Sequence, residues 1–232
     1  MKVGIIQSNF LPWRGYFDFI REVDLFVLED DLQYTKGDWR NRNRIKSPRG
    51  SEWITVPVSY KHTTQLIQDT PIDYSQPGAQ KMLNRIRESY RNAPYFQPYF
   101  SELSELLNQR VAYISNLNIS LIRWACRHLE IKTPLQFSKD YYPHGTKTER
   151  VIDILRKVGA TVYLSGPAGR NYILPELFEQ AGIQLEYKQY NYPEYEQLYP
   201  PFDPYVTILD LLFMTGKKAY HYLNLTPKGK VE

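Results

Sequence analysis

The order of apolar segments at the start of the chain constrains the fold more than any other feature of the sequence. Residues 2–6 form a short apolar run that predicts a buried strand, and residues 15–22 carry apolar side chains at helical spacing. Residues 24–28 form a second apolar run. Because a strand, a helix and a strand in this order make the first unit of a parallel sheet, we expect an α/β protein with an open, mostly parallel sheet.

The rest of the sequence continues this alternation around a helical middle. The chain has 232 residues, which suits one domain of ordinary size. We therefore expect residues 1–232 to form a single α/β domain, in which residues 75–135 are a candidate helical insertion. Hydrophobic spacing predicts further strands at residues 53–60, 136–140, 161–164 and 184–187, and helices at residues 78–92, 102–108, 112–129, 148–158, 174–181 and 207–215.

Composition narrows the choice of partner and compartment. The formal net charge is +4, which suits a phosphate-bearing ligand but is less than polymeric nucleic acid usually requires. The single cysteine, Cys126, excludes an intrachain disulfide and lies in a helical apolar pattern that predicts a buried thiol. The sequence shows neither a signal peptide nor the roughly 20 apolar residues that span a bilayer. We expect a cytoplasmic protein without a transmembrane segment.

The first polar segment, residues 7–17, leaves the first predicted strand and enters the first predicted helix. In open α/β sheets, ligands bind beyond the carboxyl ends of the strands, and a helix N-terminus at that edge attracts phosphate. The alternative is a structural turn that buries aromatic side chains. The segment predicts binding of substrate or phosphate by Gln7, Asn9, Trp13, Arg14, Gly15 and Tyr16.

Part of this segment is similar to a known phosphate-binding turn. Phe10, Pro12 and Gly15 resemble the F-x-P-x-H-x-G-H motif of nucleotidylyltransferases of the HIGH superfamily. The resemblance implies a nucleotidylyltransferase-like start to the sheet. The two histidines of that motif are absent, because Arg14 or Trp13 and Tyr16 stand in their places. Since those histidines stabilise the leaving phosphates, this departure argues against adenylyl or nucleotidyl transfer.

The second polar segment, residues 30–46, follows the second predicted strand and mixes basic with aromatic residues. Arginine binds phosphate through its fork of N–H donors, and lysine acts as a mobile charge. Asp30 and Asp31 are candidates for a base, for partners of Mg²⁺, or for counter-ions of the cations. A charged edge strand is one alternative, and a nucleic-acid groove is another that so short a tract does not favour. The candidate site residues are Asp31, Gln33, Lys36, Trp39, Asn41, Arg42, Arg44 and Lys46; the alternating Arg40, Arg42, Arg44 and Lys46 would share one face of a strand.

Two later segments have a similar character. Lys147, Thr148 and Arg150 stand at the start of a predicted helix, where anions bind, although helix capping is the alternative role for the threonine. Ser165 and Gly166 follow a predicted strand in a loop of small residues, with Tyr172 later in the same loop. Such a loop exposes backbone N–H groups that cradle phosphate, and an ordinary turn is the alternative. No spacing of histidines predicts a metal site.

Taken together, these segments resemble the WbqC-like protein family. Members of that family read Q-P-x-Y-L-P-W-x-G-Y-F at a segment that corresponds to residues 7–17, where Ser8 replaces the usual proline. They continue with D-D-x-Q-[FY] and W-x-N-R-N-x-I-K, which match residues 30–34 and 39–46. K-T-E-R, Y-[IL]-S-G-P and L-D-L-L-F match residues 147–150, 163–167 and 209–213, so the resemblance extends over nearly the whole chain.

This resemblance implies a bacterial protein of surface-polysaccharide (O-antigen) biosynthesis. The implied activity is that of a transferase or ligase that modifies a nucleotide-linked amino sugar, for example by aminoacyl or glycyl transfer, with ATP and Mg²⁺ as candidate cofactors. Asp31, Lys36, Arg42 and Lys46 are the candidate catalytic residues, and the other residues named above would bind substrate and phosphate. The alternative is a non-catalytic protein that binds a nucleotide sugar or acts as a scaffold. The residues leave the oligomeric state open.

Overall fold

The strand–helix–strand start of the chain forms as its apolar pattern predicts. The computed structural model describes residues 1–75 and 77–223, and in it β1 (Lys2–Ile6) and β2 (Leu25–Leu28) are parallel neighbours joined through α1 (Arg14–Arg21). Three later strands, β5 (Leu135–Phe137), β6 (Val162–Ser165) and β7 (Gln184–Tyr187), complete a parallel sheet in the order β5-β2-β1-β6-β7. The predicted α/β class with an open parallel sheet is confirmed.

The strand order reverses direction beside β1. The chain builds outward from β1 to β2 and β5, and then returns to the other side of β1 with β6 and β7. The connections at β1 and β6 therefore diverge toward opposite sides of the sheet. Such a point leaves a crevice beyond the carboxyl ends of the two strands, which is where open α/β proteins bind ligands.

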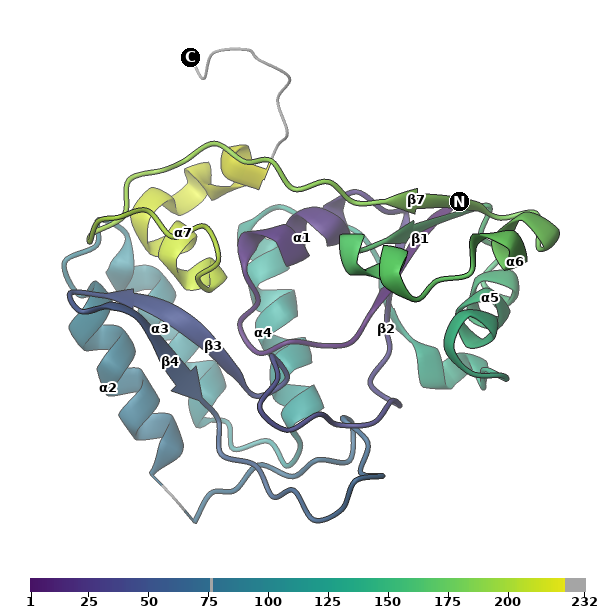
Figure 1. Cartoon of the computed structure of the whole chain (residues 1–232). Coiled ribbons are helices and arrows are strands. Elements are labelled where there is room, and N and C mark those ends of the chain that lie inside the picture. Colours follow the sequence, from purple (N-terminus) through teal and green to yellow (C-terminus); the bar gives the residue numbers. More distant parts are fainter. Residues whose placement is uncertain (76, 224–232) are drawn as a thin grey trace.

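The two faces of the sheet have separate cores because side chains alternate along each strand. Val3, Ile5 and Val27 point into the smaller core, where α5 (Lys147–Lys157) and α6 (Pro175–Gln180) pack against them. Phe26 and Leu28 point to the opposite face and join the larger core with α1. Figure 1 shows α5 and α6 on the side of β7 and α1 beside the helices of the other half.

The larger core also contains the helical middle of the chain. Its helices are α2 (Gly78–Tyr90), α3 (Phe96–Asn108) and α4 (Ile114–His128), and α7 (Ile208–Thr215) packs with them. The predicted helix at 102–108 is wrong at its start, because the helix begins at Phe96 and includes Pro98. Proline is tolerated there since the first turn of a helix donates no intrahelical hydrogen bonds. Whether residues 75–135 are an insertion stays a prediction.

The basic second segment forms one strand of a hairpin outside the parallel sheet. β3 (Arg42–Ser47) pairs with β4 (Gly50–Thr55) in antiparallel register. The predicted strand at 53–60 is wrong in extent: it starts earlier, at Gly50, and ends at Thr55, before Pro57. The short 3-10 helices are η1 (Ser138–Tyr141), η2 (Pro167–Asn171) and η3 (Gly216–Leu223). Within the residues that the structure describes, no helix combines the length and apolarity needed to cross a membrane.

Candidate functional site

The exit of β1 is a polar turn that other segments hold in place. Gln7 accepts a hydrogen bond on its backbone carbonyl from the hydroxyl of Tyr16, at 3.1 Å. The guanidinium of Arg40 donates to the side-chain oxygen of Asn9 and, at 3.1 Å, to that of Gln7. The backbone N–H of Ser8 donates to Asp30 at 2.7 Å. Arg40 therefore orients the two amide side chains that the sequence places at this strand end.

Three consecutive carboxylates follow β2, and each has a partner. Arg150 donates to Glu29 at 2.9 Å and to Asp31 at 2.6 Å, and thereby joins α5 to the end of β2. Asp31 also accepts a hydrogen bond from the hydroxyl of Ser138. Burial raises the pKa of the Glu29 carboxyl above its ordinary value, although the Arg150 guanidinium opposes this shift.

A cavity of about 270 Å³ lies between the ends of β1 and β6, at the N-terminus of α5; we call it the switch-point cavity. Lys147 is exposed at its rim, and Thr148 is buried with its hydroxyl accepting from Leu174 N at 3.4 Å. The cavity combines a helix N-terminus with cationic and amide side chains, which is the chemistry that binds phosphate. Five predicted binding residues line it: Gln7, Lys147, Thr148, Arg150 and Tyr172.

A second cavity, of about 300 Å³, is bounded by aromatic rings; we call it the aromatic cavity. The ring centroids of Trp13 and Tyr205 are 5.5 Å apart. Gly15 permits this placement of Trp13, because a Cβ at Gly15 would lie 2.2 Å from the indole ring. Four predicted binding residues line the cavity: Asn9, Trp13, Trp39 and Arg44. Because Gln7 lines the first cavity and Asn9 the second, Arg40 connects the two.

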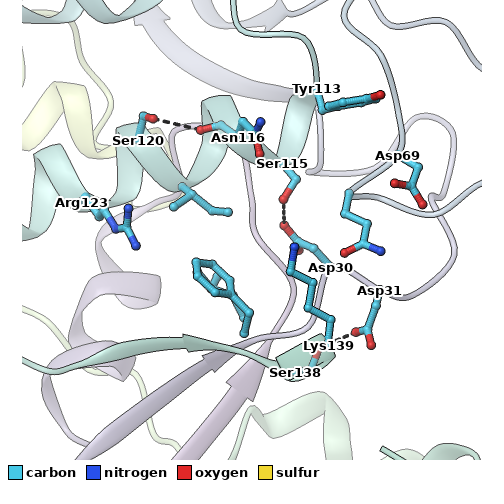
Figure 2. Close-up of a pocket in the computed structure, with 14 residues that line it drawn as sticks. Asp30, Asp31, Asp69, Tyr113, Ser115, Asn116, Ser120, Arg123, Ser138 and Lys139 are labelled. Carbon is cyan, nitrogen blue, oxygen red and sulfur yellow. Dashed lines mark hydrogen bonds between the residues drawn. The ribbon is translucent and has the colours of Figure 1, made fainter. Parts of the chain in front are cut away.

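A third and larger cavity, of about 590 Å³, lies beyond the ends of β2 and β5; we call it the β2–β5 cavity. Figure 2 shows Asp30, Asp31 and Asp69 around it, with Arg123 of α4 toward the opposite end. Asp30 accepts a hydrogen bond from the hydroxyl of Ser115 in the first turn of α4. Of the predicted site residues, Asp31 alone is among those that line this cavity.

Several predicted site residues lie beneath the C-terminal segment instead. Arg14 is buried, donates to the carbonyl of Pro193 at 2.8 Å and packs 4.7 Å from the ring centre of Tyr192. This burial lowers the pKa of Arg14. Lys46 is also buried and donates to the carbonyl of Pro201. Asn41 is buried as well and donates to Val56 O at 2.8 Å. Their predicted contacts with a ligand stay predictions. Each side chain donates to a backbone carbonyl, while Arg14 Nε and Asn41 Oδ1 have no hydrogen-bond partner among the described residues.

The remaining predicted residues are not among those that line the three cavities. Arg42 stacks over Trp53 with 4.3 Å from its guanidinium carbon to the ring centre, and Gln33 and Lys36 are exposed in the segment before β3. Ser165, followed by Gly166, ends β6, and its hydroxyl donates to the Gly166 carbonyl at 3.1 Å. The catalytic set of Asp31, Lys36, Arg42 and Lys46 is therefore not gathered in one cavity.

Sequence reasoning missed several polar residues of this edge. Glu29 and Arg40 were within reach of a sequence argument, because Glu29 directly follows a buried strand and Arg40 belongs to the basic segment. Arg123 and Lys139 carried no such signal, since each lies outside every motif. Throughout residues 1–75 and 77–223, no three His, Cys, Asp or Glu side chains are grouped so as to hold a metal ion.

Comparison with known proteins identifies the family. The model of the WbqC-like protein family matches residues 7–222. The uncharacterized protein Rv1507c of Mycobacterium tuberculosis (strain ATCC 25618 / H37Rv) is 42% identical over 225 residues, which covers 96% of this chain and 97% of that protein. No solved structure matches this chain. With a family match over most of its length and a relative of this identity, the chain belongs to the WbqC-like protein family.

Proposed function

We propose that this protein binds a nucleotide-linked small molecule at the carboxyl edge of its parallel sheet and acts on it as a transferase or ligase. The proposed setting is surface-polysaccharide biosynthesis, and the proposed substrate is a nucleotide-linked amino sugar. The observation that carries the proposal is the convergence of Gln7, Lys147, Thr148 and Arg150 in the switch-point cavity. These residues come from segments far apart in the sequence and meet where the strand order reverses.

Phosphate fits the switch-point cavity for two physical reasons. α5 is an 11-residue helix whose N-terminal N–H groups and positive dipole end favour an anion. Lys147 adds a mobile charge at the rim, while Arg150 is engaged with Glu29 and Asp31. We therefore assign phosphate contact to Lys147 and the α5 N-terminus, and a positioning role to Arg150.

The aromatic cavity suits the ring of a base or a sugar. Trp13, Trp39 and Tyr205 offer flat apolar faces, and Asn9 and Arg44 offer hydrogen-bonding groups beside them. The Nε of Arg44 is buried, and no hydrogen-bond partner for it is found among the described residues. A ligand that spans both cavities would pass Arg40, which supplies a further cation between a phosphate and a ring.

Chemistry on such a ligand has one candidate for proton transfer. Glu29 lines the switch-point cavity, and burial raises its pKa above the ordinary value of a carboxyl, which favours a role in proton transfer. ATP and Mg²⁺ remain proposed cofactors. Since Glu29 and Asp31 are ion-paired with Arg150, the phosphates of the nucleotide would supply most of the ligands for Mg²⁺.

A non-catalytic binding protein is the second candidate function. Its specific support is that all three carboxylates after β2 already have protein partners, which stabilises a preformed site but leaves none unpaired as a base. This candidate predicts nucleotide-sugar binding without turnover.

Isothermal titration with ATP, UDP and UDP-N-acetylglucosamine, each with and without Mg²⁺, tests the proposal. We expect saturable binding of one nucleotide class and a loss of about tenfold in affinity for Lys147→Ala, which removes one charge-assisted contact. The control is Lys132→Ala, an exposed lysine that precedes β5 at the opposite end of the strands. Equal affinity in both variants, or no binding of any nucleotide, would contradict the proposal. Mass spectrometry of the bound nucleotide after incubation with candidate acceptors separates a transferase from a binding protein.

A further inference from the structure

The β2–β5 cavity is not used by the proposed nucleotide site, although it is the larger space. At about 590 Å³ it exceeds the volume of the switch-point cavity about twofold. It opens beyond β2 and β5, on the far side of β2 from the point where the strand order reverses. None of the residues that line it also lines the switch-point cavity.

Positively charged side chains line the cavity near the aromatic ring of Phe137. The guanidinium carbon of Arg123 and the ammonium of Lys139 each lie 6.0 Å from the ring centre of Phe137. Both side chains are exposed, and among the described residues neither has a carboxylate within ion-pair distance. Two cations that line one cavity without a counter-ion favour an anionic group beside them.

The other part carries negative charge. Asp30 accepts hydrogen bonds from the Ser8 N–H and the Ser115 hydroxyl, and Asp31 is paired with Arg150. Asp69 is exposed on the same cavity, and the described part of the chain offers its carboxylate no hydrogen-bond donor. Figure 2 places Asp69 and Arg123 at opposite ends of the cavity. An ammonium group fits beside Asp69, with Asp30 as a second, partly neutralised charge.

The apolar residues Leu28, Ile119 and Phe137 also line the cavity. From this arrangement we infer that the β2–β5 cavity binds an elongated zwitterion, with a protonated amine at Asp69, an anionic group beside Arg123 with Lys139 as a second cation, and an apolar body along Phe137. The binding rests on the cavity alone. Its role as the site of the second substrate rests on the proposed function, because Asp31 and Arg150 connect it to the switch-point cavity.

Titration with charge-matched probes tests this inference. The probes are ε-aminocaproate, which has both charges, caproate and hexylamine, which have one each, and glycine, which is too short to reach both ends. Phosphoethanolamine replaces the carboxylate with phosphate and shows which anion the cations prefer. We expect ε-aminocaproate or phosphoethanolamine to bind at least about tenfold more tightly than caproate, hexylamine and glycine.

Substitutions of two exposed residues test which end of the cavity binds the anionic group and which binds the amine. Arg123→Gln should weaken ε-aminocaproate and caproate and leave hexylamine unchanged, whereas Asp69→Asn should weaken ε-aminocaproate and hexylamine and leave caproate unchanged. The matched control is Arg127→Gln on the same helix, because Arg127 is ion-paired with Glu102 at 2.6 Å. Zwitterion affinity that is equal in wild type and both variants, or no better than that of the singly charged probes, overturns the inference.

The same proteins distinguish this inference from the proposed function. UDP affinity should be unchanged by Arg123→Gln and Asp69→Asn, because neither residue lines the switch-point cavity. UDP binding without selective zwitterion binding would refute the zwitterion site alone. Selective zwitterion binding without any nucleotide binding would refute the proposed function and leave the zwitterion site standing.

Discussion

Charged residues gather in two regions of this molecule, and the regions differ in what surrounds the charge. At the carboxyl edge of the sheet, Lys147 and Arg150 border cavities. Beneath the segment after β7, Arg14, Lys46 and Asp210 are buried among tyrosines and backbone carbonyls. Both sets come from segments that resemble the same family. A family motif alone therefore does not distinguish residues that contact a ligand from residues that make contacts inside the protein. The burial of each side chain does distinguish them.

The buried set should dominate stability. Asp210 accepts hydrogen bonds from the hydroxyls of Tyr90 at 2.9 Å and Tyr195 at 2.8 Å, and from the side-chain amide of Gln197 at 3.0 Å. Asp210→Ala leaves these buried donors unpaired and should lower the free energy of unfolding by about 3 kcal/mol. Urea denaturation measures this loss. The exposed Asp69→Ala is the control, with an expected change within about 0.5 kcal/mol, and a similar value for both variants would refute the distinction.

Two cations at helix starts make the comparison sharper. Arg14→Ala should destabilise the fold by about 2 kcal/mol, because it removes a buried hydrogen bond and packing against three aromatic rings. It should leave the nucleotide affinity of the folded protein unchanged. Lys147→Ala should do the reverse, with lost affinity and nearly unchanged stability. Nucleotide titrations and denaturation curves on both variants measure the two effects. Loss of nucleotide affinity in Arg14→Ala alone would make Arg14, and not Lys147, the ligand-binding cation.

Glu29 should give the sheet edge a pH-dependent stability. Burial raises the pKa of Glu29 above its ordinary 4.5, so the folded protein holds this proton more tightly than the unfolded chain. That contribution is complete below about pH 4.5 and is lost as pH rises through the raised pKa. Wild type should therefore lose stability relative to Glu29→Gln over this range, as measured by denaturation at a series of pH values. Wild-type stability that stays constant or rises relative to Glu29→Gln as pH increases would contradict this prediction, and a rise would show that the pairing with Arg150 outweighs burial.

The last prediction concerns the reactivity of Cys126. Burial raises the pKa of its thiol to about 12, and the residue is 7% exposed. We expect alkylation in the native protein to be slower than in urea by about a hundredfold or more, because the thiolate forms only after local opening. Rapid native labelling would place the thiol at the surface.

The sequence predicted the parallel sheet because β1, α1 and β2 each obey a local period that needs no knowledge of the rest of the chain. It also predicted Gln7, Lys147 and Arg150 as site candidates, since parallel strands end at one edge. It could not separate Arg14 from Arg150. Arg14 is covered by residues such as Pro193 and Tyr192, which are 178 or more positions away, so its burial is a long-range property.

The β2–β5 cavity could not be predicted from the sequence for a related reason. Arg123 is one of several basic residues on an amphipathic helix, and Lys139 follows a strand only three residues long. Neither local pattern indicates that Arg123 and Lys139 line one cavity beside Phe137. Their shared placement depends on how α4 packs beside β5, which hydrophobic spacing alone does not determine.

A crystal structure of the protein with bound UDP would test the central claim most directly. The account predicts the diphosphate in the switch-point cavity, at the N-terminus of α5 and within hydrogen-bond distance of Lys147, with Arg14 and Lys46 still beneath the C-terminal segment. Phosphates held instead by Arg14 or Lys46, with that segment displaced, would contradict the division of the charged residues into a ligand-binding set and a structural set.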